Sequence, residues 1–234
     1  MDGQNLQQEL EESEAFNESQ ILELLKSLLP VLEFIHSQQV IHRDIKPENI
    51  IRRKNNNQLI LVDFGAAKYA TKTGLGVTGT VIGYAGYAAP EQSVGKATFA
   101  SDIYSLGVTC IHLLTGVEPF ELFDVSENDW VWRDYLQSSV SDEIGKILDK
   151  MIVGATKKRF ENVGEILSLI QPTSQRKKRS LELPKIRRYL ACIFTKIQIQ
   201  FIYWLLLAYT HDYLINIKKV FFRLITIRAL ATQS

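Results

Sequence analysis

The chain has 234 residues, of which 46% are hydrophobic and 23% are charged, a composition that fits a globular protein of one or two domains. Its formal net charge of +1 excludes a general electrostatic affinity for nucleic acid. Two cysteines, Cys110 and Cys192, are too few for a disulfide framework and indicate reduced thiols. The polar start of the chain is not a signal peptide, so we expect residues 1–170 to be cytoplasmic.

The charge is divided unevenly along the chain. Residues 1–170 contain 15 Lys and Arg against 24 Asp and Glu, whereas residues 171–234 contain 12 against 2. All 13 glycines lie before residue 171. This change in composition predicts a boundary near residue 170 between two unlike segments.

The first strong helical pattern covers residues 19–36. Its aliphatic residues recur at three- and four-residue steps, namely Ile21, Leu24, Leu25, Leu28, Leu32 and Ile35. Pro30 lies inside this pattern and should kink the helix or loosen one turn. A short strand is expected at residues 40–41. Residues 50–52 and 59–62 flank a run of three asparagines and predict a β-hairpin.

The next segment, residues 66–100, is rich in Gly, Thr and Ala without a period, and we expect an ordered loop there. Residues 101–114 predict a second long helix, capped by Ser101 and ended by Gly116. Two further helices fit residues 142–153 and 162–170. The expected fold is therefore mainly helical.

Four polar residues around the expected hairpin suit phosphoryl transfer, which needs a carboxylate at the acceptor hydroxyl and cations on the phosphates. Asp44 would orient and deprotonate the hydroxyl, and Lys46 would reach the γ-phosphate. Asn49 and Asp63 offer hard oxygen ligands for Mg²⁺. Because Asn49 enters one strand and Asp63 leaves the other, both side chains should face one metal site.

Three motifs follow one another in order, and the first two contain Asp44, Asn49 and Asp63. They are His42-Arg43-Asp44 with Asn49 five residues after the aspartate, Asp63-Phe64-Gly65, and Ala89-Pro90-Glu91. This order resembles the signature of protein kinases, and Lys46-Pro47 is similar to their serine/threonine branch. The resemblance covers about residues 2–170. Small-molecule phosphotransferases also pair such an aspartate with an asparagine, but they lack Ala-Pro-Glu and the long activation segment.

The resemblance implies an enzyme that transfers the γ-phosphate of ATP to Ser or Thr hydroxyls of a protein, with ATP and Mg²⁺ as cofactors. It implies the C-terminal lobe of the bilobal α+β kinase fold over residues 1–170, with a small hairpin that carries the catalytic loop, 42–49, and the metal site. Residues 63–91 would be the activation segment. Asp44 and Lys46 would be catalytic, Asn49 and Asp63 would hold the metal, and Lys46 would also contact the nucleotide.

The same resemblance gives supporting roles to His42 and four other residues. Arg43 would meet a phosphate or an acidic group of the activation segment. Glu91 would form a buried ion pair with Arg159, and Asp102 would hold the backbone of the catalytic loop.

The N-terminal lobe of the family supplies a glycine-rich phosphate loop, a lysine and a helix glutamate, and none of these is found before His42. We therefore expect the chain to begin at the hinge and to depend on a separate N-lobe or a partner protein. Residues 74–81 match the glycine-rich pattern letter for letter, but they lie inside the activation segment, so an activation loop is the better interpretation. The rival function is a catalytically silent kinase fragment that acts as a binding or regulatory module.

The activation segment holds two further features. Thr71, Thr73, Thr78 and Thr80 are either phosphorylation sites, whose phosphate would pair with Arg43, or plain loop residues. Tyr84 occupies a position where serine/threonine kinases usually have threonine.

The C-terminal segment, residues 171–234, begins with Arg176-Lys177-Lys178-Arg179 and continues into an apolar, aromatic stretch. Its uncharged core, residues 197–210, is shorter than the roughly 20 residues of a spanning helix. Three interpretations stay open: membrane contact through residues 189–217, a helical tail that binds a partner, or a segment without an evolved function.

Overall fold

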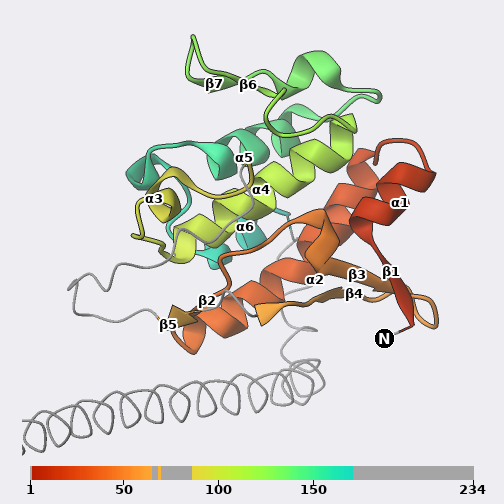
Figure 1. Ribbon diagram of the computed structural model, residues 1–234, viewed down its shortest axis with the longest axis horizontal. Coiled ribbons are helices and arrows are strands. Elements are labelled where there is room, and N and C mark those ends of the chain that lie inside the picture. The colour runs from red at the N-terminus through yellow and green to blue at the C-terminus, as the bar shows by residue number, and fades with distance from the viewer. Residues whose placement is uncertain (1, 65–67, 70–85, 171–234) are drawn as a thin grey trace, which may run out of the picture. The chain divides into compact units, whose positions relative to one another are not determined.

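The computed structural model describes residues 2–64, 68–69 and 86–170 (Figure 1). The chain divides into two units, Met1–Lys177 and Lys178–Ser234, and the described residues all belong to the first. The expectations for the C-terminal segment, including membrane contact through residues 189–217, therefore lie outside the described residues. Within the described residues, no helix combines the length and the apolar character that crossing a membrane requires.

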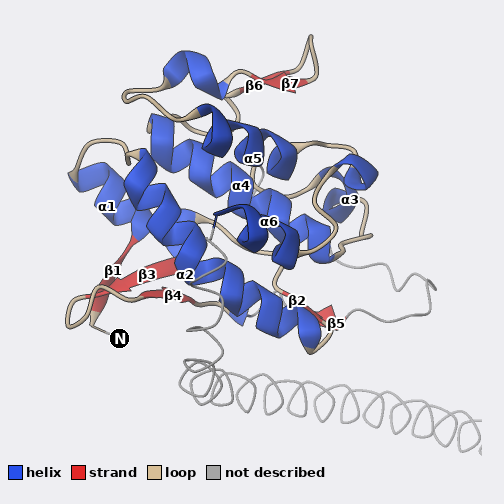
Figure 2. Cartoon of the chain, turned by 180° about the vertical axis from the view of Figure 1, so that it is seen from behind, coloured by secondary structure: helices blue, strands red, loops and turns tan. Residues whose placement is uncertain are grey.

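Two long helices form the centre of the first unit. Helix α2 (Glu18–Ser37) packs against helix α4 (Phe99–Thr115), while α5 (Asp142–Ile152) packs on α4 and α6 (Val163–Ile170) packs on α2 (Figure 2). The helices predicted at residues 19–36, 142–153 and 162–170 are confirmed with ends shifted by one residue. Pro30 is buried inside α2, and the helix continues through it.

The start of α4 differs from the prediction. The helix begins at Phe99 and its N-cap is Thr98. Ser101 is the third residue of the helix and completes a capping box, in which its hydroxyl accepts from the backbone N–H of Thr98 at 2.9 Å. Ser101 is thus the reciprocal partner of the cap rather than the cap itself. The helix ends at Gly116, as predicted, with a left-handed φ of 70° that glycine adopts without steric cost.

Three small antiparallel sheets accompany the helices. The predicted hairpin is confirmed as β3 (Ile50–Arg53) and β4 (Leu59–Leu61), and the unpredicted β1 (Gly3–Asn5) pairs with the outer side of β3. The predicted strand β2 (Val40–Ile41) pairs with β5 (Lys68–Tyr69). The third sheet joins β6 (Phe123–Asp124) to β7 (Asp129–Trp130).

The remaining elements are short. They are α1 (Leu6–Glu12), α3 (Pro90–Ser93) and four-residue or shorter 3₁₀ turns at η1 (Pro47–Asn49), η3 (Trp132–Tyr135) and η4 (Thr156–Lys158). The loop predicted over residues 66–100 is wrong where β5, α3 and the first turn of α4 form. Proline at the first position of α3 is favourable because its missing N–H would have no partner there.

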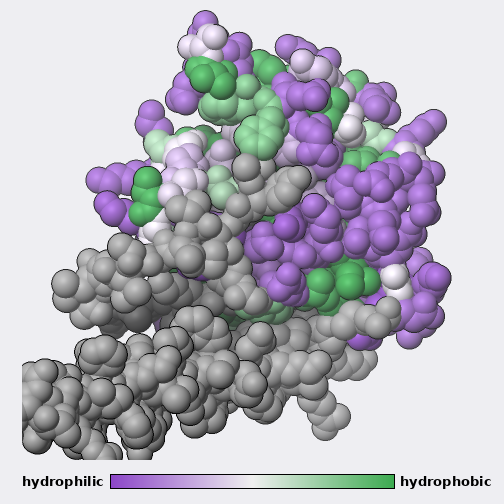
Figure 3. All heavy atoms as spheres, in the orientation of Figure 1, coloured by the Kyte–Doolittle hydropathy of each residue, from purple (hydrophilic) through white to green (hydrophobic). Residues whose placement is uncertain are grey.

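The face seen in Figure 3 is mainly hydrophilic on its right-hand side. Hydrophobic side chains show there as small separate patches, some of them near the end that carries β6 and β7. The large hydrophobic residues that are exposed among the described ones are Val94, Phe120, Val125, Tyr135 and Leu169. The core beneath is continuous across α2, α4, α5 and α6, and it supports the loops that carry the polar residues of interest.

Helices α4 and α5 approach each other closely at Gly107. A Cβ atom added there would lie 2.8 Å from Ile152 Cγ2 and 2.8 Å from Met151 Cβ. We expect Gly107→Ala to lower the free energy of unfolding by about 1–2 kcal/mol, because overpacking outweighs the better helix propensity of alanine. Urea unfolding measures this change. Gly154→Ala is the control, since its Cβ would meet only Pro90 Cγ, at 4.0 Å; a loss as large as that of Gly107→Ala would contradict the packing argument.

Candidate functional site

Asp102, on α4, holds the start of the loop between β2 and β3. Its side chain is fully buried. Its Oδ2 accepts a hydrogen bond from the backbone N–H of His42 at 2.9 Å, and its Oδ1 accepts one from the N–H of Arg43 at 2.8 Å. His36 Nε2, from the end of α2, lies 2.8 Å from the same Oδ2. Arg43 has a left-handed φ of 70°, so these bonds stabilise a backbone conformation that arginine rarely adopts.

Asp44 follows this anchor and is bound by two further residues of the loop. The amide nitrogen of Asn49 donates to the backbone oxygen and to Oδ2 of Asp44, each at 2.8 Å. Lys46 Nζ lies 3.5 Å from Asp44 Oδ1. The structure thus brings together three of the residues that the sequence singled out. Because Asn49 uses its amide nitrogen toward Asp44, its Oδ1 is the atom that remains to bind a cation.

Asp63 lies just beyond β4 and beside Asn49. The backbone N–H of Val62 donates to the backbone oxygen of Asn49 at 2.9 Å, which places the next residue, Asp63, at the same end of the hairpin. Asp63 is exposed and has a φ of 58°, a conformation that aspartate tolerates better than most residues.

The donor atoms at this end of the hairpin fit Mg²⁺, since an amide oxygen and a carboxylate are both hard ligands. Among residues 2–64, 68–69 and 86–170, no group of three or more His, Cys, Asp and Glu side chains is placed to hold a metal. The two residues therefore suit an ion that takes most of its ligands from phosphates and water, as Mg²⁺ commonly does.

His42 is buried below the loop. Its Nε2 lies 3.2 Å from the backbone oxygen of Val62, and its ring meets the edge of Phe64 at 4.6 Å between centroids. Burial lowers the pKa of His42 below its ordinary value, and the nearby carboxylate of Asp102 offsets only part of this effect. The ring is therefore neutral at pH 7 and links the loop of residues 42–49 to the end of strand β4, which precedes Asp63.

Glu91 and Arg159 form an ion pair at the start of α3. Arg159 Nη1 lies 2.8 Å from Glu91 Oε1, and the hydroxyl of Ser101 donates to the same oxygen at 2.7 Å. Burial alone would raise the pKa of Glu91, but the hydrogen bonds from Arg159 and Ser101 outweigh it and lower the pKa. The next residue, Gln92, donates from its amide to the backbone oxygen of Arg43 at 2.7 Å, which connects the start of α3 to the loop of residues 42–49.

Several of these partners were not identified from the sequence: His36, Ser101 as a ligand of Glu91, Gln92, and the pair of Tyr87 with His112. The hydroxyl of Tyr87 is hydrogen-bonded to Nδ1 of His112, inside α4. His36 and His112 both fall on the apolar face of a long helix. A polar residue on a buried helical face needs a hydrogen-bond partner, and this was the feature of the sequence that could have marked them. Nothing in the sequence indicated their partners, which lie up to 66 positions away.

Two buried histidines, His42 and His112, should make the stability of the fold depend on pH. Burial lowers the pKa of each below the ordinary 6.5. The unfolded chain therefore takes up these protons first as the pH falls below 6.5, and folding weakens by up to about 1.4 kcal/mol per pH unit for each ring. We expect His112→Gln to make the slope shallower between pH 6.5 and 5, measured by urea unfolding; an unchanged slope would contradict the assignment.

Some of the predicted positions lie outside the described residues. They are the four threonines, Thr71, Thr73, Thr78 and Thr80, together with Tyr84 and the glycine-rich match at residues 74–81. Their proposed roles stay predictions.

Comparison with known proteins agrees with the resemblance seen in the motifs. Residues 1–169 match the family model of the protein kinase domain. The chain is 37% identical to serine/threonine-protein kinase B of Synechocystis over 72% of its length and 31% of that protein, and 37% identical to serine/threonine-protein kinase PknA of Nostoc over 73% and 31%. It spans about a third of the length of the curated relatives it matches. Because the family model covers residues 1–169 of the chain, the chain belongs to the protein kinase family.

Proposed function

We propose that residues 2–170 are the C-terminal lobe of a serine/threonine protein kinase, which in the complete enzyme transfers the γ-phosphate of ATP to a Ser or Thr hydroxyl of a protein. The observation that carries this proposal is the arrangement around Asp44. Its carboxylate is held by Asn49 and lies near Lys46, on a loop whose backbone is fixed by the buried Asp102. A carboxylate fixed in this way suits the alignment and deprotonation of an acceptor hydroxyl.

The other polar groups support the same chemistry. Lys46 would place positive charge beside the transferred phosphate, and Asn49 Oδ1 and the Asp63 carboxylate would hold Mg²⁺. Bound Mg²⁺ neutralises charge that develops on the phosphates. The relatives are named serine/threonine-protein kinases, which supports a hydroxyl of a protein as the acceptor.

The test joins the N-terminal lobe of Nostoc PknA to the first residue of this chain and measures transfer of radioactive phosphate from ATP to casein. We expect transfer to Ser and Thr, and a loss of about 10²- to 10⁴-fold in Asp44→Asn, because the base is removed while the shape is kept. Asp134→Asn, an exposed change on η3, is the matched control. A folded fusion without transfer would contradict the proposal and favour the silent binding module.

The chain by itself should bind Mg-ATP poorly. Asp44, Lys46, Asn49 and Asp63 would meet only the γ-phosphate and the metal, whereas the family's phosphate loop and its lysine supply other contacts to the nucleotide. We expect isothermal titration calorimetry with Mg-ATP to show no micromolar binding. A dissociation constant in the micromolar range would mean that described residues hold more of the nucleotide than proposed.

A further inference from the structure

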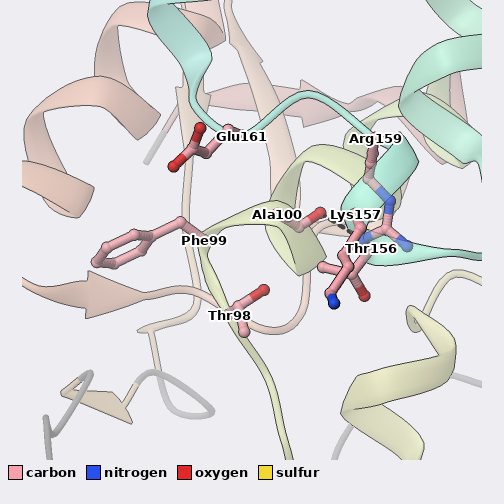
Figure 4. A pocket seen from close by; sticks show the side chains of 7 residues that line it. All are labelled: Thr98, Phe99, Ala100, Thr156, Lys157, Arg159 and Glu161. Carbon is pink, nitrogen blue, oxygen red and sulfur yellow. Dashed lines mark hydrogen bonds between the residues drawn. The ribbon is translucent and has the colours of Figure 1, made fainter.

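A cavity away from the catalytic loop carries a second site. It has a volume of about 440 Å³, within the range of small-ligand pockets. Its walls come from the start of α4, from η4 and from the segment that follows η4 (Figure 4). The lining residues are Thr98, Phe99, Ala100, Thr156, Lys157, Arg159 and Glu161.

One wall of the cavity is the ring of Phe99, which is half-buried. His36 stacks on this ring with 4.7 Å between centroids, so the ring is held in place and offers its remaining surface to the cavity. A fixed aromatic surface suits another ring, because offset stacking adds to the burial of apolar area.

Two charges of opposite sign flank this surface. Lys157 and Glu161 are exposed, and neither side chain forms an ion pair or a hydrogen bond with any residue that the structure describes. In Figure 4, Glu161 lies on the side of the Phe99 ring, and Lys157 lies on the other side with Thr156. An anion alone would be repelled by Glu161 and a cation alone by Lys157, so a ligand with both charges is favoured over either.

We propose that this cavity binds a short peptide end: a free ammonium group at Glu161, an aromatic first side chain on Phe99, and a carboxylate at Lys157 with the hydroxyls of Thr98 and Thr156. A dipeptide with an aromatic first residue carries all three of these groups and is small enough for a cavity of about 440 Å³. The proposal concerns binding alone and does not depend on phosphoryl transfer.

The cavity touches the two networks that fix the catalytic loop. Arg159 lines it and binds Glu91, while Phe99 stacks on His36, which contacts Asp102. A ligand that restrains these walls should also restrain the loop, because packed and hydrogen-bonded groups carry coupling between sites. Hydrogen exchange at the backbone amides of His42 and Arg43, which donate to Asp102, should therefore slow when the peptide binds.

The test uses the full 234-residue chain and saturation-transfer NMR with the dipeptide Phe-Gly. We expect saturable binding, weakened about fivefold or more when the ammonium is acetylated, when the carboxylate is amidated, or when Ala-Gly replaces Phe-Gly. Lys157→Gln and Glu161→Gln should weaken Phe-Gly binding to the same degree. Lys158→Gln, an exposed neighbour that does not line the cavity, should leave it unchanged.

Three results would overturn the proposal. These are no saturation transfer from Phe-Gly, equal binding of all four peptides, or binding unaffected by Lys157→Gln and Glu161→Gln while both variants melt at the temperature of the unmodified chain. Because both changed side chains are exposed, these variants should keep the fold, and a loss of binding would report the site itself.

Discussion

Replacing Arg159 with leucine is expected to lower the free energy of unfolding by about 3–5 kcal/mol, because the change leaves the carboxylate of Glu91, which is only 14% exposed, without its cation. The side chain of Arg159 is wholly buried. Besides Glu91 it donates to the backbone oxygens of Val153, Ala100 and Gly154, and its guanidinium lies 4.8 Å from the ring centroid of Tyr104. The substitution would remove all of these contacts at once, although the hydroxyl of Ser101 would still donate to Glu91.

Arg133 offers a matched control. It too binds a carboxylate with both nitrogens, at 2.6 and 2.7 Å from Asp149, and it lies over the ring of Trp132. The two side chains of this pair are 48% and 44% exposed, so solvent screens the interaction. We expect Arg133→Leu to cost about 1 kcal/mol or less, and equal costs for the two arginines in urea unfolding would show that burial does not decide the difference.

A double-mutant cycle separates the pair from the rest of the network. Glu91→Leu and Arg159→Leu together should cost less than the sum of the single changes, by about 0.5–3 kcal/mol. An additive result would contradict a direct interaction.

The pKa of Glu91 is lowered in the folded chain. The stability that its charge contributes is therefore fully present above pH 4.5, the ordinary pKa, and is lost as the pH falls below that value.

The parts of the fold that could be predicted are those in which one sequence pattern decides the outcome. The spacing of aliphatic residues defined α2 and α5, and Gly116 defined the end of α4. Strand β1 and helix α1 have no such pattern, since they contain three and seven residues. They form because β1 pairs with β3 and because Leu6 is buried. The start of α4 was misplaced because Thr98 and Ser101 both favour a cap, and only the backbone shows which one takes that position.

The candidate site divides in the same way. The proximity of Asp44, Asn49 and Asp63 could be predicted from their spacing around a hairpin, because a hairpin brings its two ends together independently of how the rest of the chain packs. The contacts of Asp102 with His36, or of Gln92 with Arg43, depend on how α2, α3 and α4 pack. Sequence spacing holds no information on such contacts. The motif predicted that Asp102 holds the backbone of the loop, but it did not predict that His36 contacts the same carboxylate.

Asp102→Asn should destabilise the chain by about 3 kcal/mol although it keeps the size of the side chain. Asp102 Oδ2 accepts a hydrogen bond from the backbone N–H of His42 and faces His36 Nε2, while Oδ1 accepts one from the backbone N–H of Arg43. The side-chain amide introduced by Asp102→Asn could take two orientations. In one its NH₂ group would face the N–H of His42, and in the other it would face the N–H of Arg43, so one of these donors would lose its acceptor. A buried donor without a partner costs about 1–3 kcal/mol, and more where a charged group is lost, so a single atom exchange is enough for the effect.

Hydrogen exchange distinguishes this mechanism from a general loss of stability. In Asp102→Asn, the amides of His42 and Arg43 should exchange faster than those in the middle of α5, because their acceptor is lost while α5 keeps its own hydrogen bonds. Asp134→Asn, an exposed aspartate, should change neither the unfolding curve nor the exchange pattern. A uniform acceleration across the chain would contradict a local anchor. If only His42 and Arg43 change, the left-handed turn at Arg43 depends on Asp102, and so does the position of Asp44 beside it.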